Sequence, residues 1–354
     1  MHRQKIDVVY ASPGRVTPGG LGRYCRHYRS PWMHEPAYRE FLHEMVAKDS
    51  FDVILPLCEP LQRIAWDLPE PFASRVFPSA THEQRRLLDD RRAMYEFVAN
   101  LGIPVPRMMP VTSPADFEPI ARELGWPLVL RGTQGVAGQQ VRIVQDQADL
   151  TTAYDALQSE SPQPLFAQAF VPGTRTVMGT LLQDGAMLRA FAHRSLETYP
   201  GATGPSIRGR SIGDPRLLDH ASLLFRALKW NGLALAEFMH GHDGEYYFME
   251  INPRPWATIL IAEACGAPMI GAFIRRLKGE SVDAQPPYVI GREVPVFPGF
   301  LSARIRAGGF PRVRDLGSYL RLFRAIPAMR LGVLWHHTRT LAWEWRHRDA
   351  CRSE

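Results

Sequence analysis

Two glutamates and an asparagine close to a tight turn have the residue types and the spacing of a metal-binding site. Asp243-Gly244 separates two alternating runs, and an Asp-Gly pair in that position predicts a two-residue β-hairpin turn. In that register Glu237 lies directly opposite Glu250, and Asn252 points to the same face two residues later. Two carboxylates and an amide oxygen on one face are hard ligands of the kind that Mg²⁺ prefers, and a dication would relieve the repulsion between the carboxylates.

The other face of this hairpin is expected to be apolar and packed against a core. In the same register that face carries Phe238, Met249 and Ile251. Two alternatives remain open at this point. The glutamates could be an ordinary solvent-facing pair without a metal, or a longer turn from His240 to Glu245 could shift the register.

The order Glu237, then Glu-Ile-Asn-Pro-Arg at 250–254, resembles the metal-binding signature of the ATP-grasp superfamily, which includes biotin carboxylase and carbamoyl-phosphate synthetase. Three further blocks resemble this superfamily in the same chain order. They are an Asp-Arg helix start at 90–91 leading into Gly-Ile-Pro-Val-Pro, a strand–glycine loop–strand at 127–144, and a hinge at 167–173. The resemblance implies an ATP-grasp fold, with ATP as its cofactor.

The resemblance also implies which residues contact the phosphates of ATP. Arg91 and Arg131 stand where the family usually has lysines, and arginine keeps the charge but presents a planar fork. Gly135 and Gly138 would let backbone amides approach the phosphates closely. A plain β-hairpin turn is the alternative for this glycine-rich loop.

The hinge is expected to hold the adenosine part of the nucleotide. Gln168 occupies the position of the residue that meets the adenine amino group, and Phe170-Val171 would offer backbone atoms to the adenine edge. Thr176 departs from the acidic residues often seen nearby in the family, but it could still form a weak hydrogen bond to the ribose. A strand that ends in a turn is compatible with the same residues.

The chemistry implied by the resemblance is ligation in two steps. A substrate carboxylate attacks the γ-phosphate to give an acyl phosphate and ADP, and an amine then displaces phosphate. Glu237, Glu250 and Asn252 would hold Mg²⁺ or Mn²⁺, while Asn252 and Arg254 would be catalytic, with Arg254 stabilising the transferred phosphoryl group. A nucleotide-binding protein without ligase turnover and a small-molecule kinase on the same fold are the alternatives.

Substrate recognition is expected in the segment 193–211. This segment resembles the His-Arg and glycine-rich stretch of ATP-grasp carboxylate–amine ligases, and Arg194, Arg208 and Arg210 could bind a carboxylate with two parallel hydrogen bonds. The alternative for Arg208 and Arg210 is a basic surface loop.

The patterns together predict an α/β (α+β) protein. We expect an abbreviated N-terminal α/β pre-grasp domain at 1–80, and an ATP-grasp domain at 81–280 with a lid subdomain at about 105–170. The first domain lacks the strand and helix with which related enzymes open, either because the fold is trimmed or because the start codon lies upstream. A linker and a basic helical tail follow at 281–354. Expected strands lie at 5–11, 52–57, 128–131, 141–144, 165–171, 177–183 and 186–195, and expected helices at 35–48, 81–101, 113–124, 148–158 and 217–228.

The positive charge is concentrated in the C-terminal tail. The chain of 354 residues has a formal net charge of +6, and residues 301–354 hold eleven arginines against four acidic residues. A helix packed on the catalytic body is favoured for this tail over peripheral contact with a membrane, and nucleic-acid binding is not expected. Four widely spaced cysteines without a Cys-x-x-Cys pair indicate reduced thiols and a cytoplasmic location. Small-molecule carboxylate and amine substrates are the expected partners, and the oligomeric state is not predicted.

Overall fold

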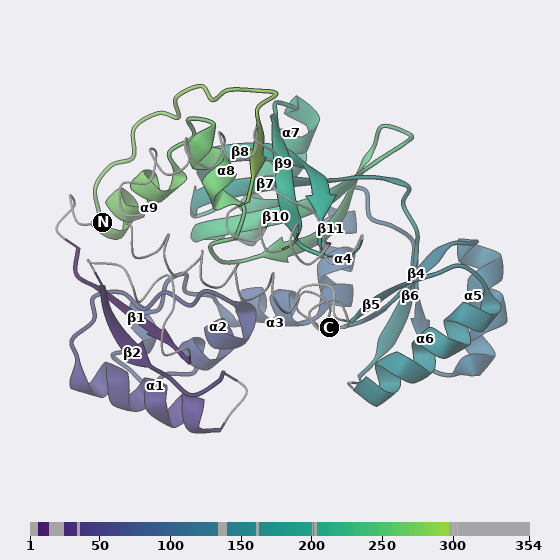
Figure 1. Cartoon of the computed structure of the whole chain (residues 1–354), viewed down its shortest axis with the longest axis horizontal. Coiled ribbons are helices and arrows are strands. Elements are labelled where there is room, and N and C mark those ends of the chain that lie inside the picture. Colours follow the sequence, from purple (N-terminus) through teal and green to yellow (C-terminus); the bar gives the residue numbers. More distant parts are fainter. Residues whose placement is uncertain are drawn as a thin grey trace. The chain divides into compact units, whose positions relative to one another are not determined.

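Figure 1 shows the computed structural model of the whole chain, which divides into two compact units by its internal contacts. It describes residues 6–13, 25–33, 36–133, 140–160, 163–199, 201, 204–296, 300 and 303. Unit 1 comprises Met1–Ser79, Ile207–Ser211 and Arg254–Glu354, and unit 2 comprises Ala80–Ser206 and Ile212–Pro253. The basic helical tail that the sequence predicts at the C-terminus lies outside the described residues.

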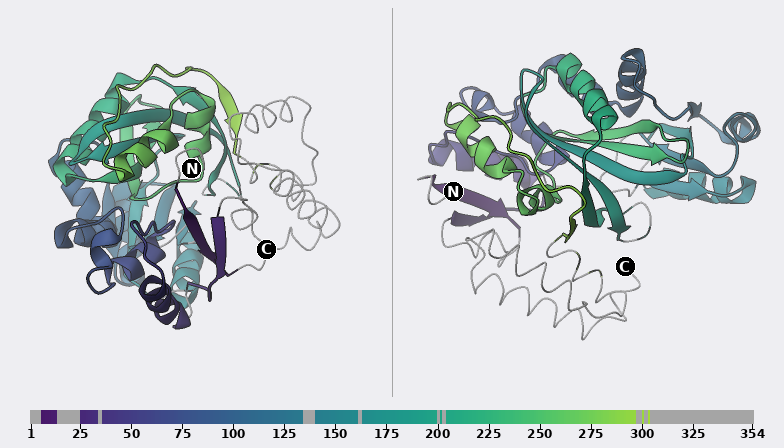
Figure 2. Two further views of the ribbon diagram at one scale, coloured as in Figure 1. Left: turned by 90° about the vertical axis from the view of Figure 1, so that its left-hand side faces the viewer. Right: turned by 90° about the horizontal axis from the view of Figure 1, so that it is seen from above.

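Unit 1 contains a parallel pair of short strands, β1 and β2, which lie side by side in Figure 2. The helix α1 buries one stripe of apolar side chains at helical spacing, Tyr38, Leu42 and Val46. The strand predicted at 52–57 is wrong: Ile54 forms only an isolated bridge with Val76, because Pro56 cannot donate to a ladder. The elements of this unit are β1 (Val8–Ser12), β2 (Cys25–Arg29), α1 (Ala37–Lys48), α2 (Glu59–Trp66), η2 (Ala73–Arg75), α8 (Ile259–Ala264), α9 (Met269–Leu277) and β12 (Glu293–Pro295). The strand β9 (Ser206–Ile212) pairs with β12 in antiparallel fashion.

The first sheet of unit 2 has the antiparallel strand order β3-β6-β4-β5. Two helices, α5 and α6, supply the apolar side chains that bury one face of it, among them Phe117, Ile120, Leu150 and Leu157. The elements are β3 (Met108–Val111), η3 (Pro114–Asp116), α5 (Phe117–Leu124), β4 (Leu128–Gly132), β5 (Val141–Val144), α6 (Gln147–Glu160) and β6 (Leu165–Ala169). This sheet lies within the residues that the sequence assigned to the lid.

The second sheet of unit 2 has four antiparallel strands in the order β11-β10-β7-β8. They are β7 (Gly173–Gln183), β8 (Ala186–Thr198), β10 (Gly232–Gly241) and β11 (Tyr246–Asn252), and the helix α7 (Pro215–Leu228) packs against β7 and β8. Asp184 and Gly185 join β7 to β8 with positive φ angles of 48° and 80°, as a two-residue hairpin turn requires. A Cβ at Gly185 would also lie 2.5 Å from the backbone oxygen of Phe225.

The helix predicted at 81–101 is two helices, α3 (His82–Asp89) and α4 (Arg91–Asn100). Thr81 and Gln84 cap α3 reciprocally, as the sequence indicates. Asp90 then leaves the helical conformation, and its carboxylate accepts the backbone N–H groups of Arg92 and Ala93. A new helix therefore begins at Arg91, which places that side chain in the first turn of α4.

The predicted register of the metal-binding hairpin is confirmed at the two glutamates, since Glu237 pairs with Glu250. The predicted two-residue turn is wrong, because the N–H of Gly241 bonds to the carbonyl of Glu245, which leaves three residues in the loop. A bulge beside Glu237 takes up the extra residue, since Phe238 pairs with Phe248 instead of Met249. The extra residue in the loop and the extra residue in the bulge therefore offset each other, so the predicted pairing of Glu237 with Glu250 is retained.

The bulge also corrects the prediction for the apolar face. Phe248, and not Met249, joins Phe238, with ring centroids 5.8 Å apart. Met249 instead lies with its sulfur 3.9 Å from Nε2 of Gln168. The hairpin therefore has an apolar face, as predicted, but Phe248 of β11 takes the place predicted for Met249.

Candidate functional site

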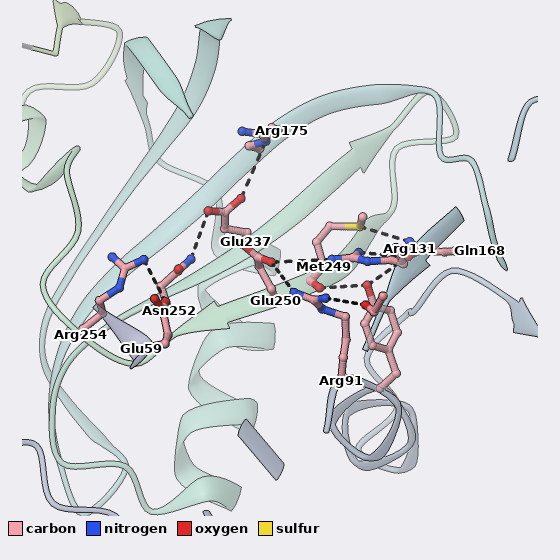
Figure 3. A network of polar contacts seen from close by, with 12 residues as sticks. Glu59, Arg91, Arg131, Gln168, Arg175, Glu237, Met249, Glu250, Asn252 and Arg254 are labelled. Carbon is pink, nitrogen blue, oxygen red and sulfur yellow. Dashed lines mark hydrogen bonds and ion pairs between the residues drawn. The ribbon is translucent and has the colours of Figure 1, made fainter. Parts of the chain in front are cut away.

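Strand pairing in the second sheet of unit 2 gathers the proposed metal ligands on one face. Glu250 pairs with Glu237, Glu237 with Val177, and Val177 with His193. Directly opposed residues of antiparallel strands project to the same side, so these four side chains share what we call the carboxylate face. Figure 3 shows the two carboxylates with the polar side chains around them.

Glu237 is held by an amide and a guanidinium. Nδ2 of Asn252 donates to its Oε1 at 3.2 Å, and Nε of Arg175 lies 3.8 Å from its Oε2. Arg175 also donates from Nη1 to the carbonyl of Gly204 at 2.7 Å. Sequence reasoning missed Arg175. This residue lies two positions before Val177 on β7, so its side chain projects to the carboxylate face as well.

Glu250 lies against two arginines from other elements of unit 2 (Figure 3). Nη2 of Arg91, on α4, donates to Oε2 of Glu250 at 3.3 Å, and Nη2 of Arg131, on β4, lies 3.8 Å from the same oxygen. Arg91 also donates to the carbonyl of Gly132. The structure therefore brings both predicted phosphate-contacting arginines to a predicted metal ligand.

These charges act strongly on one another because both guanidiniums are largely withdrawn from water. Burial raises the pKa of Glu250, but the nearby guanidiniums of Arg91, Arg131 and Arg175 lower it, and the net pKa lies below its ordinary value. Burial and the like charge of Arg131 lower the pKa of Arg91, and Glu250 opposes that shift. Glu250 is therefore an ionised counter-charge between two cations that repel each other.

A buried network connects Arg131 with the start of the hinge. Nη1 of Arg131 donates to Oε1 of Gln168 at 3.2 Å, and the hydroxyl of Tyr95 donates to the carbonyl of Met249 at 2.9 Å and lies 3.5 Å from the same Gln168 oxygen. Both Tyr95 and Gln168 are buried. Phe170 and Val171 are half-buried in the connection from β6 to β7. The contacts of Gln168, Phe170 and Val171 with adenine stay predictions.

The structure does not bring Arg194 and Thr176 to the carboxylate face. They pair with each other on β8 and β7, and Thr176 pairs with Phe238 on the apolar face. Nη2 of Arg194 lies 3.4 Å from Nδ1 of His240, and Thr176 donates to the carbonyl of Thr174. Because successive residues of a strand alternate between faces, His193, and not Arg194, occupies the carboxylate face.

The remaining predicted substrate and catalytic arginines lie in unit 1. Arg208 and Arg210, on β9, both pair with Glu293 of β12, Arg208 at 3.7 Å. Nη2 of Arg254 lies 2.9 Å from Oε1 of Glu59, at the start of α2. Sequence reasoning missed both acidic partners, because Glu293 lies in the span assigned to a linker and Glu59 precedes a proline far away in the chain.

The donor set fits a hard divalent cation. Glu237 and Glu250 offer carboxylate oxygens and Asn252 offers an amide oxygen from one face, which suits Mg²⁺. Within the described residues no group of three or more His, Cys, Asp or Glu side chains is gathered, so a site here relies on the amide and on oxygens of a ligand. Gly135 and Gly138 lie in the segment 134–139, outside the described residues.

The fold is shared with enzymes of known structure that bind adenine nucleotides. Biotin carboxylase from Campylobacter jejuni, in a β-γ-ATP complex, superposes with a TM-score of 0.65 at 15% identity, over 83% of this chain and 75% of that chain. The biotin carboxylase domain of Hydrogenobacter thermophilus 2-oxoglutarate carboxylase, with MgADP, ADP and bicarbonate, gives 0.65 at 15% identity, over 82% and 69%. These likenesses establish that the chain shares the α/β fold of these enzymes.

Sequence comparison identifies the domain itself. A family model described as an ATP-grasp domain matches residues 88–258, so the chain carries an ATP-grasp domain, as the resemblance predicted. The carbamoyl phosphate synthase large chain of Thermus thermophilus is 24% identical over 272 residues, which cover 70% of this chain and 26% of that protein. The chain thus spans about a quarter of the length of this curated relative.

The described part of the chain has no helix with the length and apolar character needed to span a bilayer. The predicted membrane contact of the tail falls on residues outside that part. Peripheral membrane contact and the cytoplasmic location both stay predictions.

Proposed function

We propose that the protein is an ATP- and Mg²⁺-dependent ligase that joins a carboxylate to an amine through an acyl phosphate, with release of ADP and phosphate. The observation that carries the proposal is the convergence of Glu237, Glu250 and Asn252 on one face, with Arg91 and Arg131 directly at Glu250. The ATP-grasp domain and its likeness to nucleotide-bound carboxylases support the same assignment.

The nucleotide is held by cationic and polar side chains of unit 2. Arg91 and Arg131 are fork-shaped donors suited to phosphate oxygens, and the hinge after β6 would receive the adenine. Glu237, Glu250 and Asn252 would hold the divalent cation, which supplies charge neutralisation at the phosphates. Positioning and charge neutralisation of this kind are what phosphoryl transfer needs from a protein.

We propose two chemical steps on that arrangement. An oxygen of the substrate carboxylate attacks the γ-phosphorus, the bond to the β-phosphate oxygen breaks, and ADP leaves. The uncharged amine then attacks the acyl carbon, loses a proton, and expels phosphate. Arg254 would stabilise the negative charge on the transferred group, and its pairing with Glu59 restricts its guanidinium.

The test is ADP and phosphate release by the full-length protein with ATP and Mg²⁺, using pooled small carboxylates with and without pooled amines. Release that needs both pools supports the ligase. A stable phosphorylated product without an amine requirement would indicate a kinase instead, and nucleotide binding without any release would indicate a non-catalytic protein.

Matched variants test the site. Glu237→Gln and Glu250→Gln keep the side-chain volume but remove the negative charge, and each should abolish turnover. Glu118→Gln is the control, because Glu118 is an exposed glutamate of α5 that pairs with Arg122 on the same helix. Full turnover in either site variant would remove these glutamates from the mechanism.

A further inference from the structure

The carboxylate of Glu250 already has two cationic partners within the protein. Its Oε2 accepts a hydrogen bond from Nη2 of Arg91 at 3.3 Å and lies 3.8 Å from Nη2 of Arg131. Only 15% of the Arg91 side chain and 6% of the Arg131 side chain are exposed, so water screens these charges poorly. A divalent cation that approaches Glu250 therefore meets two guanidiniums at its carboxylate.

Glu237 is engaged in the same way. Its Oε2 lies 3.8 Å from Nε of Arg175, and its Oε1 accepts a hydrogen bond from Nδ2 of Asn252. An amide nitrogen has no lone pair for a cation, so Asn252 could ligate a metal only through its oxygen. A cation shared by both glutamates must therefore displace or reorient several internal contacts.

A nucleotide removes this obstacle for the cation. Guanidiniums bind phosphate oxygens in paired, charge-assisted hydrogen bonds, and a polyphosphate carries more negative charge than a single carboxylate. Arg91 and Arg131 would then exchange Glu250 for phosphate oxygens, which leaves Glu250 available as a ligand.

We infer that Arg91 and Arg131 gate the cation site: the free divalent cation binds weakly, and the site forms when a nucleotide polyphosphate draws both arginines away from Glu250. This inference rests on the proposed nucleotide-dependent function and adds an order of binding to it. Because coupling between two ligands is reciprocal, the cation strengthens nucleotide binding by the same factor.

The experiment uses Mn²⁺ as the probe and the paramagnetic resonance of free Mn²⁺ as the readout. Mn²⁺ is titrated into the full-length protein without nucleotide, for the wild type and for Arg91→Gln and Arg131→Gln. Each substitution removes one competing cation, so the nucleotide-free affinity for Mn²⁺ should rise about tenfold, as expected for the loss of one poorly screened like charge. Arg122→Gln on α5 is the control, since it removes an exposed arginine from the same unit, and its affinity should equal that of the wild type.

A second measurement follows a non-hydrolysable ATP analogue in the presence of a chelator. The wild type should bind the analogue without any divalent cation, and Arg91→Gln should bind it at least about tenfold more weakly. Arg91→Lys keeps the charge and should show no rise in nucleotide-free Mn²⁺ affinity. Melting curves establish that each variant is folded. If Arg91→Gln is not folded, Arg131→Gln takes its place in both measurements.

The outcomes separate this inference from the proposed function. If the glutamine variants bind nucleotide-free Mn²⁺ no more tightly than the wild type, while the analogue binds normally, the gating is refuted and the ligase proposal stands. If the analogue fails to bind with or without Mn²⁺, the proposed function itself fails, and the inference fails with it.

Discussion

The stability of unit 2 should fall steeply in mild acid because of one histidine, His193 on β8. Its side chain is 1% exposed, and within the described structure neither ring nitrogen has a hydrogen-bond partner. It stacks on Phe191, with ring centroids 6.0 Å apart. Burial without a partner disfavours the charged imidazolium and lowers the pKa of His193 from 6.5 to about 3.

The direction of the effect follows from that lowered pKa. Above pH 6.5 the imidazole is neutral in the folded and unfolded states, so it adds no pH dependence. As the pH falls from 6.5 towards 3, only the unfolded state binds the proton, and the free energy of unfolding falls by about 1.4 kcal/mol per pH unit. The loss reaches about 2 kcal/mol at pH 5 and roughly 5 kcal/mol when both states are protonated.

The assay is urea unfolding at pH 7.5 and at pH 5, for the wild type and for His193→Leu. The substitution removes the titrating group. Between these two pH values, the free energy of unfolding of the variant should therefore fall by about 2 kcal/mol less than that of the wild type. His82→Leu is the matched control, because His82 is an exposed histidine of the same unit and its side chain stays hydrated on folding. Equal pH dependence of the wild type and His193→Leu would refute the reasoning.

Three further substitutions test how the fold positions the site, each by urea unfolding at neutral pH. Phe248→Ala should lower the free energy of unfolding by about 3–5 kcal/mol, since the buried ring packs edge-on against Tyr95 and Phe238; a loss under about 1 kcal/mol would contradict that packing. Asp90→Ala should cost about 1 kcal/mol by removing the cap of α4, and no loss would mean that the cap is unimportant. Gly185→Ala should cost more than about 1 kcal/mol, because its φ is positive and the new Cβ meets a backbone oxygen; unchanged stability would argue against this turn geometry.

The pairing of the two glutamates could be predicted from the sequence because antiparallel partners lie at equal distances from the turn. Counting outward from Asp243-Gly244 gives the correct pair, although the turn holds one residue more than expected. The bulge that compensates has no glycine or proline to signal it. The bulge allows Phe248 to pack beside Phe238, and the order of polar and apolar residues in the sequence does not reveal that packing.

Other parts of the site depend on contacts between distant segments. Arg175 and His193 project to the carboxylate face because side chains alternate between faces along β7 and β8. That alternation predicts their position only after the pairing of those strands is known. The contact between Arg254 and Glu59 joins segments almost two hundred residues apart, and no local spacing points to it. The cap at Asp90 was visible as an aspartate before Arg-Arg-Ala, yet the continuous apolar pattern favoured a single helix.

The boundary between the two units falls inside the Glu-Ile-Asn-Pro-Arg stretch. Pro253 is the last residue of unit 2, and Arg254 is the first residue of the following segment of unit 1, where it meets Glu59 from the N-terminal segment. Homologous recombination that exchanged residues 1–79 alone would therefore separate Arg254 from its inherited partner. Such chimaeras should be more stable when the incoming segment also carries an acidic residue at the start of α2, so this ion pair influences which gene segments can be exchanged.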